Sequence, residues 1–105
     1  MSNGVTDKIA KVTEDISALP PIVILRLRNM TAIDATGIAA LEELAEILRA
    51  NGRAMLVCGA RPQPAALMHE AGFERHIGTE NICANIDEAL KRAEELREAQ
   101  KVQQR

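Results

Sequence analysis

The sequence predicts a small α/β domain in which helices flank a mainly parallel sheet. Residues 22–28 and 54–58 are apolar runs of the kind that form strands buried on both faces. Residues 37–50, between them, repeat apolar side chains at helical spacing. A strand, a helix and a strand joined by short connections predict a right-handed crossover between parallel strands. The length of 105 residues fits one domain with a single core.

The first element expected is a helix over residues 5–18, which follows a flexible N-terminus of residues 1–4. Its apolar side chains recur at spacings of four, three and four: Val5, Ile9, Val12 and Ile16. Pro20 and Pro21 end this helix, because proline lacks an amide proton and restricts the residue before it. The strand over residues 22–28 then begins, and its apolar character predicts the central position in the sheet.

The helix expected over residues 37–50 has two contrasting faces. The apolar side chains share one stripe: Ile38, Leu41, Leu44, Ala45 and Leu48. The side chains on the other face are charged: Glu42, Glu43, Glu46 and Arg49. We interpret the charged face as solvated rather than as a metal site. Asn51 and Gly52 supply a C-terminal stop.

Two shorter elements are expected after the strand over residues 54–58. A helix over residues 63–71 has three inward side chains: Leu67, Met68 and Ala71. Gly72 closes this helix, and Phe73 supplies the hydrophobic contact of the cap. Residues 82–86 then form a brief third strand or an extended segment.

A final helix is expected from Asn85 onward, because Asn85 and Glu88 have the spacing of a capping pair. Its inward side chains are Ile86, Ala89, Leu90 and Ala93. Beyond Leu96, residues 97–105 are polar almost all round, so this extension is expected to project into solvent or to fray. The domain itself is therefore expected to span residues 5–96.

Composition excludes several classes of function. The chain has 13 Lys and Arg against 15 Asp and Glu, and this net charge of −2 argues against nucleic acid as a partner. The single aromatic residue, Phe73, provides no stacking platform for bases. No apolar run is long enough to span a bilayer, and no secretory signal is visible at the N-terminus.

The cysteines and histidines give no indication of a cofactor or metal site. The spacing of Cys58, Cys83, His69 and His76 fits no zinc motif, so we interpret the cysteines as small buried side chains and the histidines as surface residues. Neither histidine lies near the turn after residue 28 in sequence, and no glycine-rich phosphate loop is present. The sequence therefore predicts a protein that is not an enzyme.

The turn between the first strand and the helix over residues 37–50 is the candidate site. Its candidate residues are Thr31, Asp34, Ala35, Thr36 and Gly37. Asp34 is expected to cap the helix, and the free N–H groups of the helix start favour acceptors or anions. Gly37 permits either the close approach of a partner backbone or a tight strand–helix contact, and both explanations remain open.

The segment that contains this turn reads RNMTAIDATGIAALEEL over residues 28–44 and resembles the signature of the STAS domain. The resemblance covers residues 5–96 and is most specific over residues 22–60. The form Ile33-Asp34-Ala35-Thr36-Gly37 is similar to STAS domains of SulP-type anion transporters. The segments Asp7-Lys8-Ile9 and Gly59-Ala60-Arg61-Pro62 fit that branch as well.

The resemblance implies a STAS fold and a non-catalytic regulatory domain on the cytoplasmic side of the membrane. In such transporters the domain couples a cytosolic signal to the part that carries sulfate or a related anion. The implied partners are the membrane domain of the parent transporter and a cytosolic regulatory protein, with the turn over residues 31–37 as the contact surface. No cofactor is implied.

Two alternatives remain open. One is a free-standing anti-sigma-factor antagonist that binds a kinase. In that branch the turn reads Asp-Ser-Ser-Gly and its first serine is phosphorylated. Ala35 occupies that position here and has no hydroxyl, so Thr36 is the one candidate for phosphorylation in the turn. The other alternative is a domain that binds a nucleotide weakly at the helix start near Thr36.

The STAS fold usually opens with two strands before its first helix, and only four residues precede Val5 here. We therefore expect these strands to be missing. In the family they lie beside the strand that matches residues 22–28, so their loss would leave that edge unpaired. This predicts self-association through residues 22–28.

Overall fold

A computed structural model describes residues 9–11 and 14–103 of the chain. Within these residues the elements follow one another in the order 3-10 helix η1 (Ile16–Ala18), β1 (Ile22–Arg26), α2 (Ala35–Ala50), β2 (Ala54–Cys58), α3 (Pro62–Glu70), α4 (Glu74–Ile77), 3-10 helix η2 (Thr79–Asn81), β3 (Ile82–Cys83) and α5 (Ile86–Gln103). The predicted α/β class is confirmed, and none of the described residues before β1 forms a strand.

The three strands form one parallel sheet in the order β1-β2-β3. The first register runs from Ile22 opposite Ala54 to Arg26 opposite Cys58. The prediction that the first strand is central is therefore wrong, because β2 lies between the other two. That strand is also shorter than residues 22–28. The N–H of Leu27 still donates to the carbonyl oxygen of Cys58, but the N–H of Met30 turns back to the carbonyl oxygen of Leu27.

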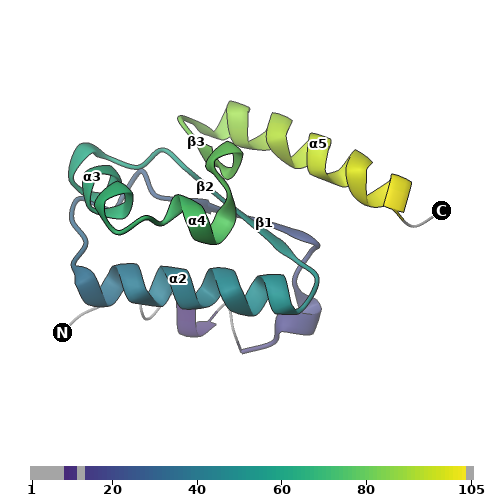
Figure 1. The fold of residues 1–105 in the computed structure, drawn as a ribbon, viewed down its shortest axis with the longest axis horizontal. Coiled ribbons are helices and arrows are strands. Elements are labelled where there is room, and N and C mark those ends of the chain that lie inside the picture. The colour runs from purple at the N-terminus through teal and green to yellow at the C-terminus, as the bar shows by residue number, and fades with distance from the viewer. Residues whose placement is uncertain (1–8, 12–13, 104–105) are drawn as a thin grey trace.

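Helices cover both faces of the sheet (Figure 1). On one face α2 packs over a core built from alternate strand residues such as Val23, Met55 and Val57, with the fully buried Phe73 among them. On the other face α5 packs over the side chains of intervening residues such as Ile24 and Leu56. The alternation of side chains along each strand thus divides the interior into two aliphatic layers.

Glycine ends two helices as the sequence predicted. Gly72 has a φ of 73°, and its N–H donates to the carbonyl oxygen of His69, while that of Phe73 reaches Met68. Gly52 also has a φ of 73° and closes α2 with the same pair of bonds. Only glycine adopts this left-handed conformation at little cost.

The first predicted helix does not run continuously to residue 18. Residues 9–11 are helical, but Glu14 and Asp15 form a turn before the short η1 helix. Asp15 has a non-helical backbone with φ −143° and ψ 83°, and its carboxylate accepts a hydrogen bond from the Ser17 hydroxyl at 2.7 Å. Such local bonds compete with helical backbone bonds. Val5, Val12 and residues 1–4 lie outside the described residues.

The C-terminal third differs in two further ways from the sequence prediction. The helix α4 was not expected, and β3 contains two residues where residues 82–86 were proposed. The helix α5 continues to Gln103 and extends away from the body of the domain in Figure 1, so the extension remains helical. Its cap is the predicted one, because Asn85 Oδ1 accepts from the N–H of Glu88 at 2.9 Å.

The inward face of α5 is narrower than predicted. Ile86, Ala89, Ala93 and Leu96 pack against the second core layer. Leu90, in contrast, is 55 % exposed, so its assignment as an inward residue is wrong. It follows Ala89 by one residue, which turns its side chain about 100° away from the sheet.

Candidate functional site

The β1–α2 turn, defined here as residues 27–37, leaves the sheet from the end of β1 and enters α2. Leu27 is buried and its N–H is bonded to β2, which fixes the start of the turn. The end is fixed by Asp34, which has an extended backbone with φ −115° and ψ −178°. Both ends of the turn are therefore fixed, one by the bond to β2 and the other by the start of α2.

The start of α3 is hydrogen-bonded to the middle of this turn. The side-chain amide of Gln63 makes two hydrogen bonds with the backbone of Ile33: Oε1 accepts from the N–H at 3.0 Å and Nε2 donates to the carbonyl oxygen at 3.1 Å. Arg61 Nε donates to the carbonyl oxygen of Arg28 at 2.6 Å. Sequence reasoning did not identify these contacts of Arg61 and Gln63, which lie about thirty residues further along the chain. These three bonds tie the backbone of the turn to the start of α3.

Asp34 is the N-cap of α2, as predicted. Its Oδ1 accepts a hydrogen bond from the N–H of Gly37 at 2.9 Å, and its carbonyl oxygen accepts from the N–H of Ile38 at 3.0 Å. The carboxylate also lies at the positive end of the helix dipole, where a negative charge is stabilising. Asp34 thus orders the turn and occupies part of the anion-attracting helix start.

Gly37 is required by packing inside the domain. A Cβ atom at this position would lie 2.6 Å from Cγ1 of Ile33, and both residues are buried. This contact is made with a residue of the turn and not with a strand, so the glycine has an internal packing role that differs from the strand–helix contact considered from the sequence. It allows α2 to start directly beside the turn.

The other four candidate residues are all exposed: Thr31, Asp34, Ala35 and Thr36. Gly37, in contrast, is buried. The structure therefore places four of the five predicted residues on one surface, whereas Gly37 packs against Ile33 inside the domain. Four present side chains to solvent on a backbone that Gln63 holds in place.

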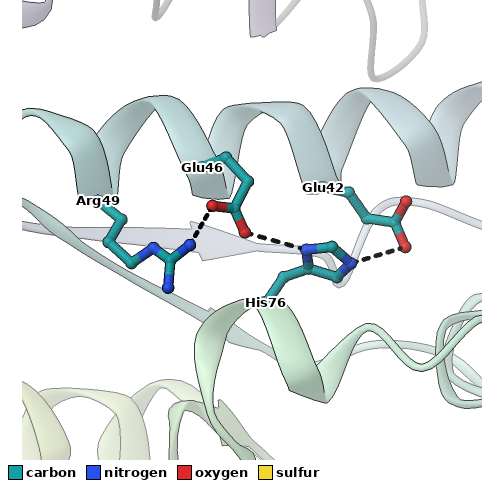
Figure 2. A network of polar contacts seen from close by, with 4 residues as sticks. All are labelled: Glu42, Glu46, Arg49 and His76. Atoms are coloured by element: carbon teal, nitrogen blue, oxygen red, sulfur yellow. Dashed lines mark hydrogen bonds and ion pairs between the residues drawn. The ribbon is translucent and has the colours of Figure 1, made fainter.

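A second polar cluster joins α4 to α2 and is shown in Figure 2. His76 Nδ1 lies 3.1 Å from Oε2 of Glu46, and His76 Nε2 lies 3.4 Å from Oε2 of Glu42. Arg49 forms an ion pair with Glu46 from the next turn of α2. Hydrogen bonds from His76 and then from Arg49 hold the pKa of Glu46 below its usual value.

This cluster corrects the prediction that Glu42 and Glu46 belong to a purely solvated face. Both contact a partly buried His76, which was expected on the surface. The sequence did not indicate this contact, because the short helix that carries His76 was not predicted. Glu43 remains exposed, as expected.

Cys58 and Cys83 are register partners on β2 and β3 and are both free thiols. Burial raises the pKa of each thiol, which keeps them protonated and poorly nucleophilic. Among residues 9–11 and 14–103, no group of three or more His, Cys, Asp or Glu side chains could hold a metal ion. In the same part of the chain, no helix is both long and apolar enough to cross a membrane.

Comparisons with known proteins agree on one fold. The family model described as the STAS domain matches residues 2–89. A sulfate transporter family protein from Wolinella succinogenes superimposes with a TM-score of 0.80 at 35 % identity, over 90 % of this chain and 78 % of that one. The SulP transporter STAS domain from Vibrio cholerae gives a TM-score of 0.81 at 27 % identity, over 90 % of this chain and 76 % of that one. A search of curated protein sequences gave no significant match.

Proposed function

Because this chain belongs to the STAS domain family, we propose that it is the non-catalytic regulatory domain of a SulP-type anion transporter. The domain would lie on the cytoplasmic side of the membrane and couple a partner to the anion-carrying part. The two structural relatives support this assignment, since one is called a sulfate transporter family protein and the other a SulP transporter STAS domain. The carried anion would be sulfate or a similar small anion.

We propose the exposed surface of the β1–α2 turn as the contact site. Thr31, Asp34, Ala35 and Thr36 are exposed on a turn whose backbone is hydrogen-bonded to the side-chain amide of Gln63. A surface that is ordered before binding loses little conformational entropy when a partner docks. This pre-ordered turn is the observation that carries the proposal. The partner would be the membrane domain of the parent transporter or a cytosolic regulatory protein.

The free-standing antagonist is less well supported. A phosphorylation switch at the first position of α2 needs a hydroxyl, and Ala35 has none. Thr36 is exposed and could accept a phosphate. The negative charge of that phosphate would be stabilised by the positive end of the helix dipole. The same phosphate would lie close to the Asp34 carboxylate that caps the helix, and like charges repel.

Nucleotide binding at the start of α2 is also less well supported. The carboxylate of Asp34 already takes the N–H of Gly37, and its negative charge opposes a phosphate at this helix end. A titration of the domain with ATP, followed by the amide shifts of residues 34–37, tests this alternative. Shifts confined to those amides would favour a nucleotide-binding role over a protein contact.

The transporter assignment is tested with the native full-length reading frame. Its translation should contain many apolar membrane spans before this domain, and a frame without them would overturn the proposal. Given such a frame, the Ala35→Glu variant is expected to lower the rate of sulfate uptake by cells several-fold at equal membrane abundance. Glutamate in the first turn suits the helix dipole, so the fold should be retained.

Ala99→Glu is the matched control. Ala99 is also an exposed alanine in a helix, but it lies on α5 and far along the chain from the turn. Its uptake rate should equal that of the unmodified protein. Equal rates for Ala35→Glu and the unmodified protein would remove the turn from the contact site.

A further inference from the structure

The strand β1 has an open edge in the part of the chain that the structure describes. β2 pairs with β1 on one side and with β3 on the other, whereas β1 has β2 as its one strand neighbour there. Residues 22–25 are all apolar but only half-buried, while residues 55–58 of β2 are at most 3 % exposed. Within residues 9–11 and 14–103, no strand therefore covers the side of β1 that faces away from β2.

The main-chain groups of this edge follow from the ladder with β2. The N–H of Ala54 donates to the carbonyl oxygen of Pro21, and the N–H of Leu27 donates to that of Cys58. Successive residues of a strand turn their N–H and C=O groups to opposite sides, so these two bonds fix the alternation. The groups of residues 23 and 25 face β2. Those of Ile22, Ile24 and Arg26 face the open edge.

β1 also lacks the features that usually keep an edge strand from pairing. Exposed edges are commonly protected by lysine, proline or a bulge within the strand. Pro20 and Pro21 precede β1, and its one charged residue is Arg26 at the far end. The strand pairs with β2 at five consecutive positions without a bulge.

We propose that the open edge of β1 pairs with β1 of a second copy of this chain, antiparallel and about a two-fold axis at Ile24. In this arrangement Ile24 lies opposite Ile24 of the second copy, and Ile22 lies opposite its Arg26. Every outward N–H and C=O group of the three residues then meets a partner. The result is a continuous six-stranded sheet.

The second copy is favoured by charge and by side-chain pairing. The antiparallel register keeps the two Arg26 side chains at opposite ends of the junction, so like charges do not face each other. Val23 lies opposite Leu25 of the second copy on the α2 face, and both are half-buried apolar residues in the isolated chain. Pairing would remove apolar surface from water on that face. This junction does not involve the β1–α2 turn and is independent of the function proposed for it.

The test is the molar mass of the chain as its concentration is raised, measured by sedimentation equilibrium. The mass is expected to rise from the 11.4 kDa of the single chain toward twice that value as the concentration is raised. The Ile24→Pro variant should stay at the single-chain mass. Proline removes the central outward N–H while leaving the bonds to β2, which come from residues 23 and 25.

Ile24→Val is the matched control, because it keeps the N–H and removes one methylene group; it should associate like the unmodified chain. Hydrogen exchange gives a second readout that needs no variant. The amides of residues 22, 24 and 26 should exchange faster when the chain is diluted. A single-chain mass at every concentration would overturn the proposal, as would association of a folded Ile24→Pro variant. Protection of the Ile24 amide that does not change on dilution would show that another segment of the same chain covers the edge.

Discussion

Replacement of Asp34 by alanine tests how the β1–α2 turn is ordered. The substitution removes the oxygen that accepts the N–H of Gly37 at 2.9 Å and the negative charge at the start of α2. Loss of an N-cap costs about 1 kcal/mol, and loss of a favourable charge at an exposed helix end costs about 0.3–1 kcal/mol. The free energy of unfolding should therefore fall by about 1–2 kcal/mol.

The assay is urea unfolding followed by circular dichroism at a helical wavelength. The midpoint should shift to lower urea with an unchanged slope, because the same surface is exposed on unfolding. In thermal unfolding, a loss of this size corresponds to a decrease of about 5–10 °C in the midpoint for a domain of this length.

The Asp34→Asn variant separates the cap from the charge. Asparagine is as good an N-cap as aspartate, so this variant should lose only the contribution of the charge, about 0.3–1 kcal/mol. If Asp34→Ala unfolds at the same urea concentration as the unmodified chain, the cap does not order the turn. If Asp34→Asn loses as much as Asp34→Ala, the hydrogen bond is not the cause. If a partner binds the folded Asp34→Asn variant more weakly than the unmodified chain, the partner contacts the Asp34 carboxylate directly.

Three further predictions concern packing and pH. Gly37→Ala should lower the free energy of unfolding by about 1–3 kcal/mol although alanine favours helices, because its Cβ would overlap Ile33; urea unfolding measures this, and a gain in stability would contradict it. Glu46→Gln should be less stable than the unmodified chain at neutral pH. The pKa of Glu46 is lowered in the folded chain, so its stabilisation is present above the unfolded value near 4.5 and is lost as pH falls through the folded value. The difference in urea midpoint should therefore disappear in strong acid, and a difference that persists there would refute the role of its bonds to His76. Leu90→Ala should change the free energy of unfolding by less than about 0.5 kcal/mol, since the side chain is exposed; a larger loss in thermal unfolding would show that Leu90 packs.

The elements predicted best are those whose signals are local. The strand over residues 54–58 matches β2 at both ends, and Asn51 and Gly52 end the helix α2 where predicted. The left-handed turn at Gly52 and the apolar run that follows it are determined by neighbouring residues and do not depend on contacts with distant segments. Asp34 was likewise identified as a cap from residue type and position, because the bond it makes reaches only three residues along the chain.

Contacts between distant segments could not be predicted in this way. The bonds of Gln63 to Ile33 and of Arg61 to Arg28 join the β1–α2 turn to the start of α3, and the parallel arrangement of β1 and β2 brings both to the same edge of the sheet. The contact of His76 with α2 depends on the four-residue helix α4, which is too short to give a periodic signal. The sequence shows which side chains could form bonds, and not which of them meet.

The sequence alone determined the α/β class, the two parallel strands, the capped helix between them and the turn that exposes Ala35 and Thr36, because each depends on side chains within one or two turns of the chain. The tertiary structure decided the rest. Among the described residues it placed β1 at the edge of the sheet, although the apolar sequence of this strand is typical of a central one, because a strand's position depends on what lies beside it. It also placed Gly37 against Ile33 and fixed the β1–α2 turn with Gln63, so the shape of the candidate surface is a property of the packed domain.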